Sequence, residues 1–90
     1  MPSVPVHVWV RHRAHRGSVS DRGTALELAG SPRDWQRACA PVHAELDVNI
    51  TRAGVVWLPV VAAGPSEPDV VRRVAAASLI FFQELLELEA

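Results

Sequence analysis

The sequence contains no lysine, no tyrosine and only one cysteine, Cys39, among its 90 residues. A single cysteine permits neither an internal disulfide nor a zinc site of four cysteines, so a reducing compartment is expected. No uninterrupted run of about 18 apolar residues occurs, and no apolar segment follows a basic start. These absences predict a cytoplasmic protein that has no signal peptide and makes no contact with a membrane.

Apart from the histidines, the nine basic residues are all arginine. This composition indicates the bias of a GC-rich, bacterial-type genome. The net charge of −1 argues against general affinity for nucleic acid. The charge is unevenly distributed, because residues 1–37 carry +3 and residues 38–90 carry −4. The two halves either attract each other within the fold or leave a basic surface free for a partner.

The C-terminal segment, residues 66–90, predicts a long helix. Ser66 is a suitable N-cap, Pro68 suits the first turn, and Asp69 stands at the spacing of a capping box. Two apolar stripes run side by side along this helix and span about 200°, roughly twice what one packed face needs. The first stripe comprises Val70, Val74, Ala77, Phe81, Leu85 and Leu88, and the second comprises Ala75, Leu79, Phe82 and Leu86. One small sheet covers the first stripe, so the second needs another partner.

Before this helix, alternation of apolar and polar residues predicts strands. We expect strands over residues 4–13, 24–29, 42–51 and 55–62, and a helix over residues 31–40 that starts at Ser31 and ends or kinks near Pro41. Residues 14–23 are rich in Gly and Ser and predict a loop, whereas residues 52–54 predict a hairpin turn. The segment 24–29 also contains good helix formers, so a helix is its alternative.

The predicted strand over residues 55–62 is apolar on both faces, as in the centre of a sheet. Pro59 donates no ladder hydrogen bond, however, so we expect an edge strand or a bulge that another subunit covers. The order of elements is strand, strand, helix, strand, strand, helix. We therefore predict one α+β domain over residues 1–90, in which an antiparallel sheet of about four strands carries two helices on one face.

Four histidines and one cysteine are the candidate ligands for a metal ion: His7, His12, His15, His43 and Cys39. Zinc needs three or four nitrogen or sulfur ligands that converge on one point, and the spacing here matches no zinc motif. We therefore predict no metal and no other cofactor.

Cys39, His43 and Asp47 include the residue types of a nucleophilic triad. The pattern places Cys39 at the end of a helix and the other two on the next strand, so nothing ensures hydrogen-bond reach between thiol and imidazole. The sequence also lacks a glycine-rich phosphate loop, Gly-x-Ser-x-Gly and His-Glu-x-x-His. Catalysis is not expected, and no catalytic residue is assigned.

A basic run over residues 11–16 follows Trp9 on the first strand. Arginine beside an aromatic ring is typical of surfaces that hold single-stranded nucleic acid. Trp9, Arg11, Arg13 and Arg16 are therefore candidate contacts, and a nucleic-acid-binding regulator is the alternative function. The simpler interpretation is a solvated strand end that pairs with the acidic half of the chain.

The second stripe of the last helix favours a different function, that of a small self-associating interaction or assembly module without catalytic activity. Leaving large apolar side chains in water forgoes roughly 1.5–3 kcal/mol each, and monomers seldom expose such patches. The candidate interface residues are Trp57, Pro59, Leu79, Phe82 and Leu86. The expected partner is a second copy, in a homodimer or a higher homo-oligomer, and a different protein is the alternative partner.

Overall fold

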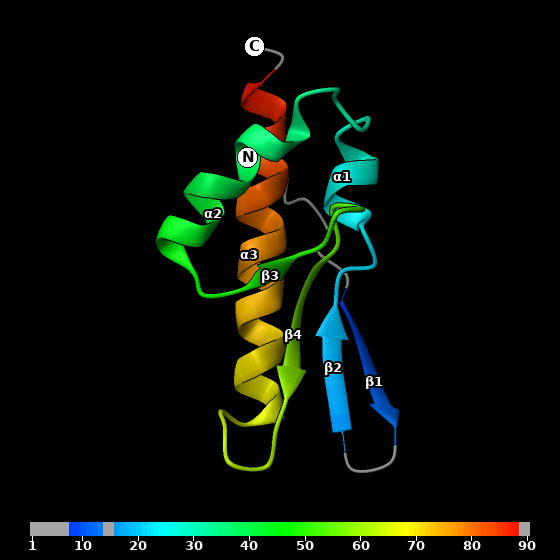
Figure 1. Ribbon diagram of the computed structural model, residues 1–90, viewed down its shortest axis with the longest axis vertical. Helices are drawn as coiled ribbons and strands as arrows, with labels where there is room; N and C mark the ends of the chain where they lie inside the picture. The colour runs from blue at the N-terminus through cyan, green and yellow to red at the C-terminus, as the bar shows by residue number, and fades with distance from the viewer. Residues whose placement is uncertain (1–7, 14–15, 89–90) are drawn as a thin grey trace.

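The computed structural model describes residues 8–13 and 16–88. In chain order its elements are β1 (Trp9–Arg13), β2 (Arg16–Ser20), α1 (Thr24–Leu28), the 3-10 helix η1 (Trp35–Ala38), α2 (Cys39–Glu45), β3 (Asn49–Ile50), β4 (Val56–Val60) and α3 (Glu67–Glu87). The strands form one antiparallel sheet in the order β1-β2-β4-β3 (Figure 1). The predicted α+β class, four-stranded antiparallel sheet and long C-terminal helix are confirmed.

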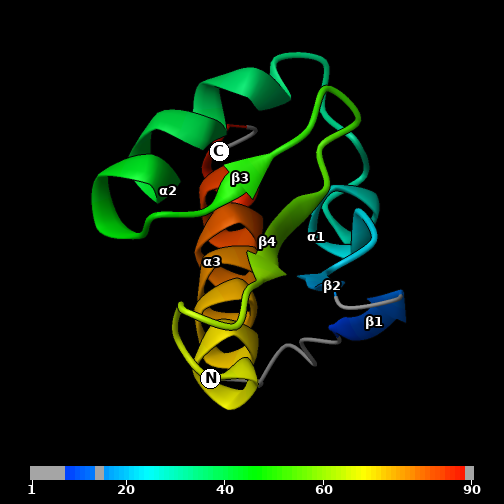
Figure 2. The same cartoon turned by 60° about the horizontal axis from the view of Figure 1, so that its bottom comes forward.

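The helix α3 lies against one face of the sheet, with α2 along one of its sides and α1 along the other (Figure 1, Figure 2). Its buried residues are Val70, Val74, Ala77, Ser78, Phe81 and Leu85. Val19 and Val56 join this core from the sheet, and the helices α1, η1 and α2 add buried residues such as Leu26, Ala38 and Val42. The core therefore lies between the sheet and all of the helices. Within the described residues, none of the helices has the length and apolar character needed to cross a membrane.

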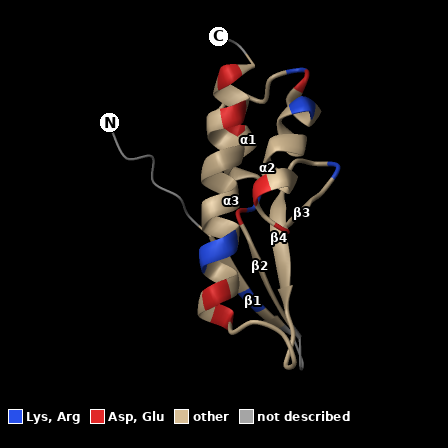
Figure 3. Ribbon diagram, turned by 90° about the vertical axis from the view of Figure 1, so that its left-hand side faces the viewer, with Lys and Arg blue, Asp and Glu red and all other residues tan. Residues whose placement is uncertain are grey.

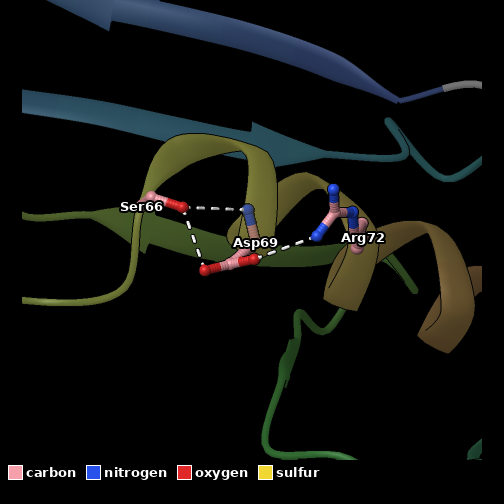
Figure 4. Close-up of polar contacts among 3 residues, drawn as sticks. All are labelled: Ser66, Asp69 and Arg72. Carbon is pink, nitrogen blue, oxygen red and sulfur yellow. Dashed lines mark hydrogen bonds and ion pairs between the residues drawn. The ribbon is translucent and has the colours of Figure 1, made fainter.

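The N-terminal cap of α3 forms at Ser66, as predicted (Figure 4). The Ser66 hydroxyl accepts a hydrogen bond from the Asp69 N–H at 3.4 Å and donates one to the Asp69 carboxylate at 3.0 Å. Arg72 donates to the same carboxylate from the next turn, at 3.2 Å. Pro68 lies in the first turn, where its missing N–H leaves no helical hydrogen bond unmade. These contacts fix where α3 begins.

Residues 16–20 form the strand β2, so the loop predicted over residues 14–23 is wrong for this part. β2 pairs with β1 on one side and with β4 on the other, which satisfies its backbone hydrogen bonds from both sides. Gly17 packs closely on Val60, where an added Cβ would lie 3.3 Å from the Val60 Cβ. Gly and Ser are poor strand formers, but pairing on both sides outweighs that preference.

Residues 24–28 form α1, so the strand predicted over residues 24–29 is wrong and its helical alternative is right. Ala25, Leu26 and Ala29 are buried, whereas Leu28 is 54% exposed. Burial at positions i, i+1 and i+4 is the spacing of a helix face. Leu26 and Leu28 alternate in sequence, but only Leu26 faces the core.

The helix predicted over residues 31–40 begins later, at Trp35, and continues as α2 through Pro41 to Glu45. Ser31 cannot cap it, because the Ser31 backbone is left-handed, with φ 48°. Pro41 lies in the first turn of α2, where its missing N–H costs little, so it does not end the helix. The prediction of a helix end near Pro41 is therefore wrong.

The strand predicted over residues 42–51 is also wrong for most of its length, since only Asn49–Ile50 forms β3. Residues four apart share a face in both a strand and a helix, so the alternation was ambiguous. Val42 is buried and Leu46 is half-buried, as a strand and a helix would both require. Ala44, which a strand would bury, is exposed.

β4 lies in the interior of the sheet, between β2 and β3, so the predicted edge position is wrong. The Asp21 N–H donates to the Val56 carbonyl at 3.0 Å, so the backbone polar groups of Val56 face β2. In an antiparallel pair the backbone groups of every second residue face the same neighbouring strand. The nitrogen of Pro59, three residues later, therefore points away from β2. On that side β3 pairs only with Val56 and Trp57, so Pro59 interrupts no ladder.

The fully buried carboxylate of Asp21 accepts three hydrogen bonds, which we call the Asp21 network. One oxygen accepts from the Gly23 N–H at 2.8 Å, before α1, and from the Val56 N–H of β4 at 3.0 Å. The other oxygen accepts from the Ser78 hydroxyl of α3 at 2.8 Å. The Asp21 carbonyl also accepts from the Thr24 N–H at 2.9 Å. Asp21 therefore joins the end of β2 to α1, β4 and α3.

We expect Asp21→Ala to destabilise the protein by about 3 kcal/mol or more, because three buried donors lose their acceptor and each costs roughly 1–3 kcal/mol. Asp21→Asn keeps one oxygen for the two backbone N–H groups and offers an amide to Ser78, so it should cost much less. Urea unfolding followed by circular dichroism measures both. An Asp21→Ala midpoint equal to that of the wild type would contradict the role given to the network.

Candidate functional site

The face of the sheet that points away from α3 carries two tryptophans in one row. The register across β1, β2, β4 and β3 gives one row of Trp9, Ser20, Trp57 and Asn49, and a second row of Arg11, Ser18 and Pro59. Val56 is fully buried against α3, and side chains alternate along a strand, so Trp57 points to the opposite side. Figure 3 shows the sheet and α3 as two layers, and we call the side with Trp57 the outer face.

The outer face is open at several of its side chains. Trp9 is 36% exposed, Arg11 and Pro59 are exposed, and Trp57 is half-buried. At the described outward positions of β1, β2 and β4, no residue is Asp or Glu. The outer face therefore combines aromatic surface with positive charge.

Arg22 adds a second cation to this face. Its guanidinium carbon lies 4.9 Å from the centroid of the Trp9 ring, within the range of a cation–π contact. Arg22 has a left-handed backbone, with φ 52°, in the tight turn that the Asp21 carboxylate holds through the Gly23 N–H. Sequence reasoning missed Asp21 and Arg22, although Asp-Arg-Gly-Thr has the Asp and Gly spacing of an Asx turn.

A second candidate surface is the flank of α3. Its residues form the flank stripe, which consists of Ala75, Leu79, Phe82 and Leu86. Leu86 is 48% exposed, whereas the other three are half-buried. The spacing of 4, 3 and 4 residues is that of a coiled-coil seam. The flank stripe thus has the pattern of a helix-packing surface that this chain leaves partly uncovered.

The predicted interface residues fall on different sides of the molecule. Trp57 and Pro59 belong to the outer face, whereas Leu79, Phe82 and Leu86 lie on α3, where Phe82 is packed against the core. No single flat surface includes both sets. Of the predicted nucleic-acid contacts, Trp9 and Arg11 lie on the outer face. Arg13 and Arg16 pair with each other at the end of the β1–β2 hairpin, and their side chains lie outside the described part.

Cys39, His43 and Asp47 do not form a catalytic group. Cys39 begins α2 rather than ending a helix, and His43 and Asp47 are exposed. In the described part of the chain, no hydrogen bond joins any two of the three. Burial raises the pKa of the Cys39 thiol, which disfavours the nucleophilic thiolate.

Among the described residues, no group of three or more His, Cys, Asp and Glu side chains is placed to hold a metal ion. Of the predicted candidates, His7 and His15 lie outside the described residues. His12 Nε2 lies 3.3 Å from a carboxylate oxygen of Glu67 in an exposed contact. This contact ties β1 to the first turn of α3 and contributes little to stability, because solvent screens it.

A shallow groove runs between α2 and α3 and is lined by Pro41, Ala44, Glu45, Ile80, Gln83 and Glu84. Glu45 is exposed and Glu84 is half-buried. The groove is open to solvent and brings together no nucleophile, base and charge partner. It therefore gives no basis for a catalytic site.

We expect iodoacetamide to alkylate Cys39 at least about tenfold more slowly in the native protein than in urea, because burial hinders access and raises the pKa of the thiol. The native rate should rise throughout pH 7 to 9, since the thiolate fraction is still increasing there. Mass spectrometry over time measures the rate. A rate that is already maximal at pH 7 would indicate an activated cysteine instead.

Comparison with models of protein families, with curated proteins and with solved structures gave no match, so the outer face and the flank stripe are interpreted from their own chemistry.

Proposed function

We propose that the protein is a small homodimeric assembly module without catalytic activity, and that two copies meet through the flank stripe of α3. The observation that carries this proposal is the partial exposure of a seam-like stripe, with Leu86 48% exposed at its end. The single cysteine supports a cytoplasmic setting, where no disulfide is needed.

The spacing of the flank stripe supports a partner helix rather than a small ligand. Positions separated by 4, 3 and 4 residues keep side chains on one line along a helix, where they interdigitate with a second helix. A two-fold dimer uses the same stripe twice, so no other complementary surface is required. Trp57 and Pro59 lie on the outer face and take no part in this interface.

The charges of α3 favour an antiparallel arrangement of the two copies. Glu67 and Asp69 offset Arg72 and Arg73 near its beginning, whereas Glu84 and Glu87 leave its end acidic (Figure 3). A parallel pair would therefore bring two acidic ends together. Arg72 is exposed beside the flank stripe. In an antiparallel pair centred on this stripe, the turn that carries Arg72 lies alongside the partner's turn that carries Glu87. The two helix dipoles also oppose each other in this arrangement.

We expect Leu86→Glu to convert the dimer into a monomer of about 9.8 kDa. A half-exposed leucine contributes roughly 1 kcal/mol on burial and occurs twice in the dimer, so the dissociation constant should rise about 10- to 100-fold. Sedimentation equilibrium measures this constant. Val61→Glu is the matched control, because Val61 is 54% exposed and lies outside α3. A wild-type protein that sediments as a monomer at high micromolar concentration would contradict the proposal.

A charge exchange tests the antiparallel arrangement. Arg72→Glu and Glu87→Arg should each weaken the dimer, because each places like charges together across the interface. The double variant restores opposite charges and should regain most of the affinity. Arg52→Glu, at an exposed arginine outside α3, should leave the sedimentation unchanged. A double variant no tighter than either single variant would contradict an antiparallel pair.

A further inference from the structure

We propose that the outer face binds single-stranded nucleic acid, with Trp9 and Trp57 as stacking surfaces and Arg11 and Arg22 as phosphate contacts. This site is separate from the flank stripe, and it does not depend on the proposed dimer. Trp57 and Arg22 enter the site only through the fold, because they are 48 and 13 residues from Trp9 in the chain.

The two tryptophans are spaced to take two different bases. Trp9 and Trp57 share a row and are separated by Ser20 on β2. Two strand spacings amount to about 10 Å, which is too wide for one base to fill between the rings. Each position therefore offers its own stacking surface: the ring of Trp57, and at Trp9 the ring together with the Arg22 guanidinium that lies over it. Ser20 and Asn49 lie in the same row and can form hydrogen bonds with base edges.

The cations lie where a backbone that follows these bases would pass. Arg11 is two residues beyond Trp9 on β1, and side chains two apart on a strand point to the same face. The described outward positions of β1, β2 and β4 carry no carboxylate that would repel phosphate. Asp47 precedes β3 and is exposed, so it bounds the favourable surface on that side.

The turn at Arg22 fixes the backbone from which its side chain reaches over Trp9. The buried Asp21 accepts the Gly23 N–H, and this contact fixes the left-handed backbone of Arg22 between them. The guanidinium lies 4.9 Å from the centroid of Trp9 and remains exposed to solvent. A planar guanidinium over an aromatic ring offers a further stacking plane for a base, as well as donors for phosphate.

This arrangement favours single strands over a duplex. A flat sheet face with separate aromatic rings engages the faces of bases, which a duplex keeps stacked inside. A proline-rich peptide is the other occupant that paired tryptophans suggest, but it gains little from two arginines. The net charge of −1 requires that binding is local to this face and sensitive to salt.

Fluorescence anisotropy of labelled 12-nucleotide dT and U oligomers tests the site, with the full chain at 20–200 mM salt. Trp57→Ala should weaken binding about 5- to 100-fold. Arg11→Gln and Arg22→Asn should each lower the slope of log affinity against log salt by about 0.7. Asparagine tolerates the left-handed backbone at position 22, so this variant keeps the fold. Arg37→Gln removes an exposed arginine from η1 and is the matched control.

Binding that these outer-face variants weaken and Arg37→Gln leaves intact would support the site. The oligomer that binds with the higher affinity, dT or U, would identify DNA or RNA as its ligand. No binding of either oligomer at 20 mM salt would overturn the proposal. If Arg37→Gln weakens binding as much as Arg11→Gln and Arg22→Asn do, the proposal is overturned as well, since the charge of the whole surface would then explain the affinity. Equal affinity for a duplex would exclude stacking. A changed sedimentation mass in Trp57→Ala would assign the outer face to a second copy of the chain.

Discussion

The buried carboxylate of Asp21 is the interaction on which the rest of this structure depends. It lies where β2 ends, and its two oxygens accept hydrogen bonds from the turn before α1, from β4 and from α3. A buried carboxylate is costly unless its oxygens are paired, so the elements that supply its donors are held in one arrangement. Apolar contacts are less directional than these hydrogen bonds, so they would fix the relative positions of the strands and helices less narrowly.

This constraint also shapes the two surfaces that remain open. On one side, Ser78 anchors α3 to Asp21, which sets the rotation of α3 and leaves the flank stripe partly uncovered, with Leu86 exposed. On the other side, the turn that Asp21 closes places Arg22 over Trp9. One buried polar group therefore orients both an apolar stripe and a cationic aromatic face. The two surfaces lie in different layers, so a dimer through α3 leaves the outer face accessible.

Sequence reasoning succeeded where the local signal and the tertiary environment agree. The cap at Ser66 and the stripes of α3 follow from spacing along one helix, and α3 adopts them. The predictions for residues 16–20, 24–29 and 42–48 are wrong, because the local patterns there were ambiguous. β2 contains Gly and Ser and is a strand only because it is paired on both sides. Val42 and Leu46 are four residues apart, a spacing that strands and helices share.

The sequence alone determined the α+β class, the long C-terminal helix, its cap and the excess of apolar surface on it, because these depend on residues close together in the chain. Only the tertiary structure decided that β4 is central despite Pro59, because this depends on the length of β3. It also decided which candidate residues meet. Trp9, Arg22 and Trp57 come together through sheet register and a turn, whereas Trp57 and Leu86 are kept apart, since a strand presents alternate residues to opposite faces.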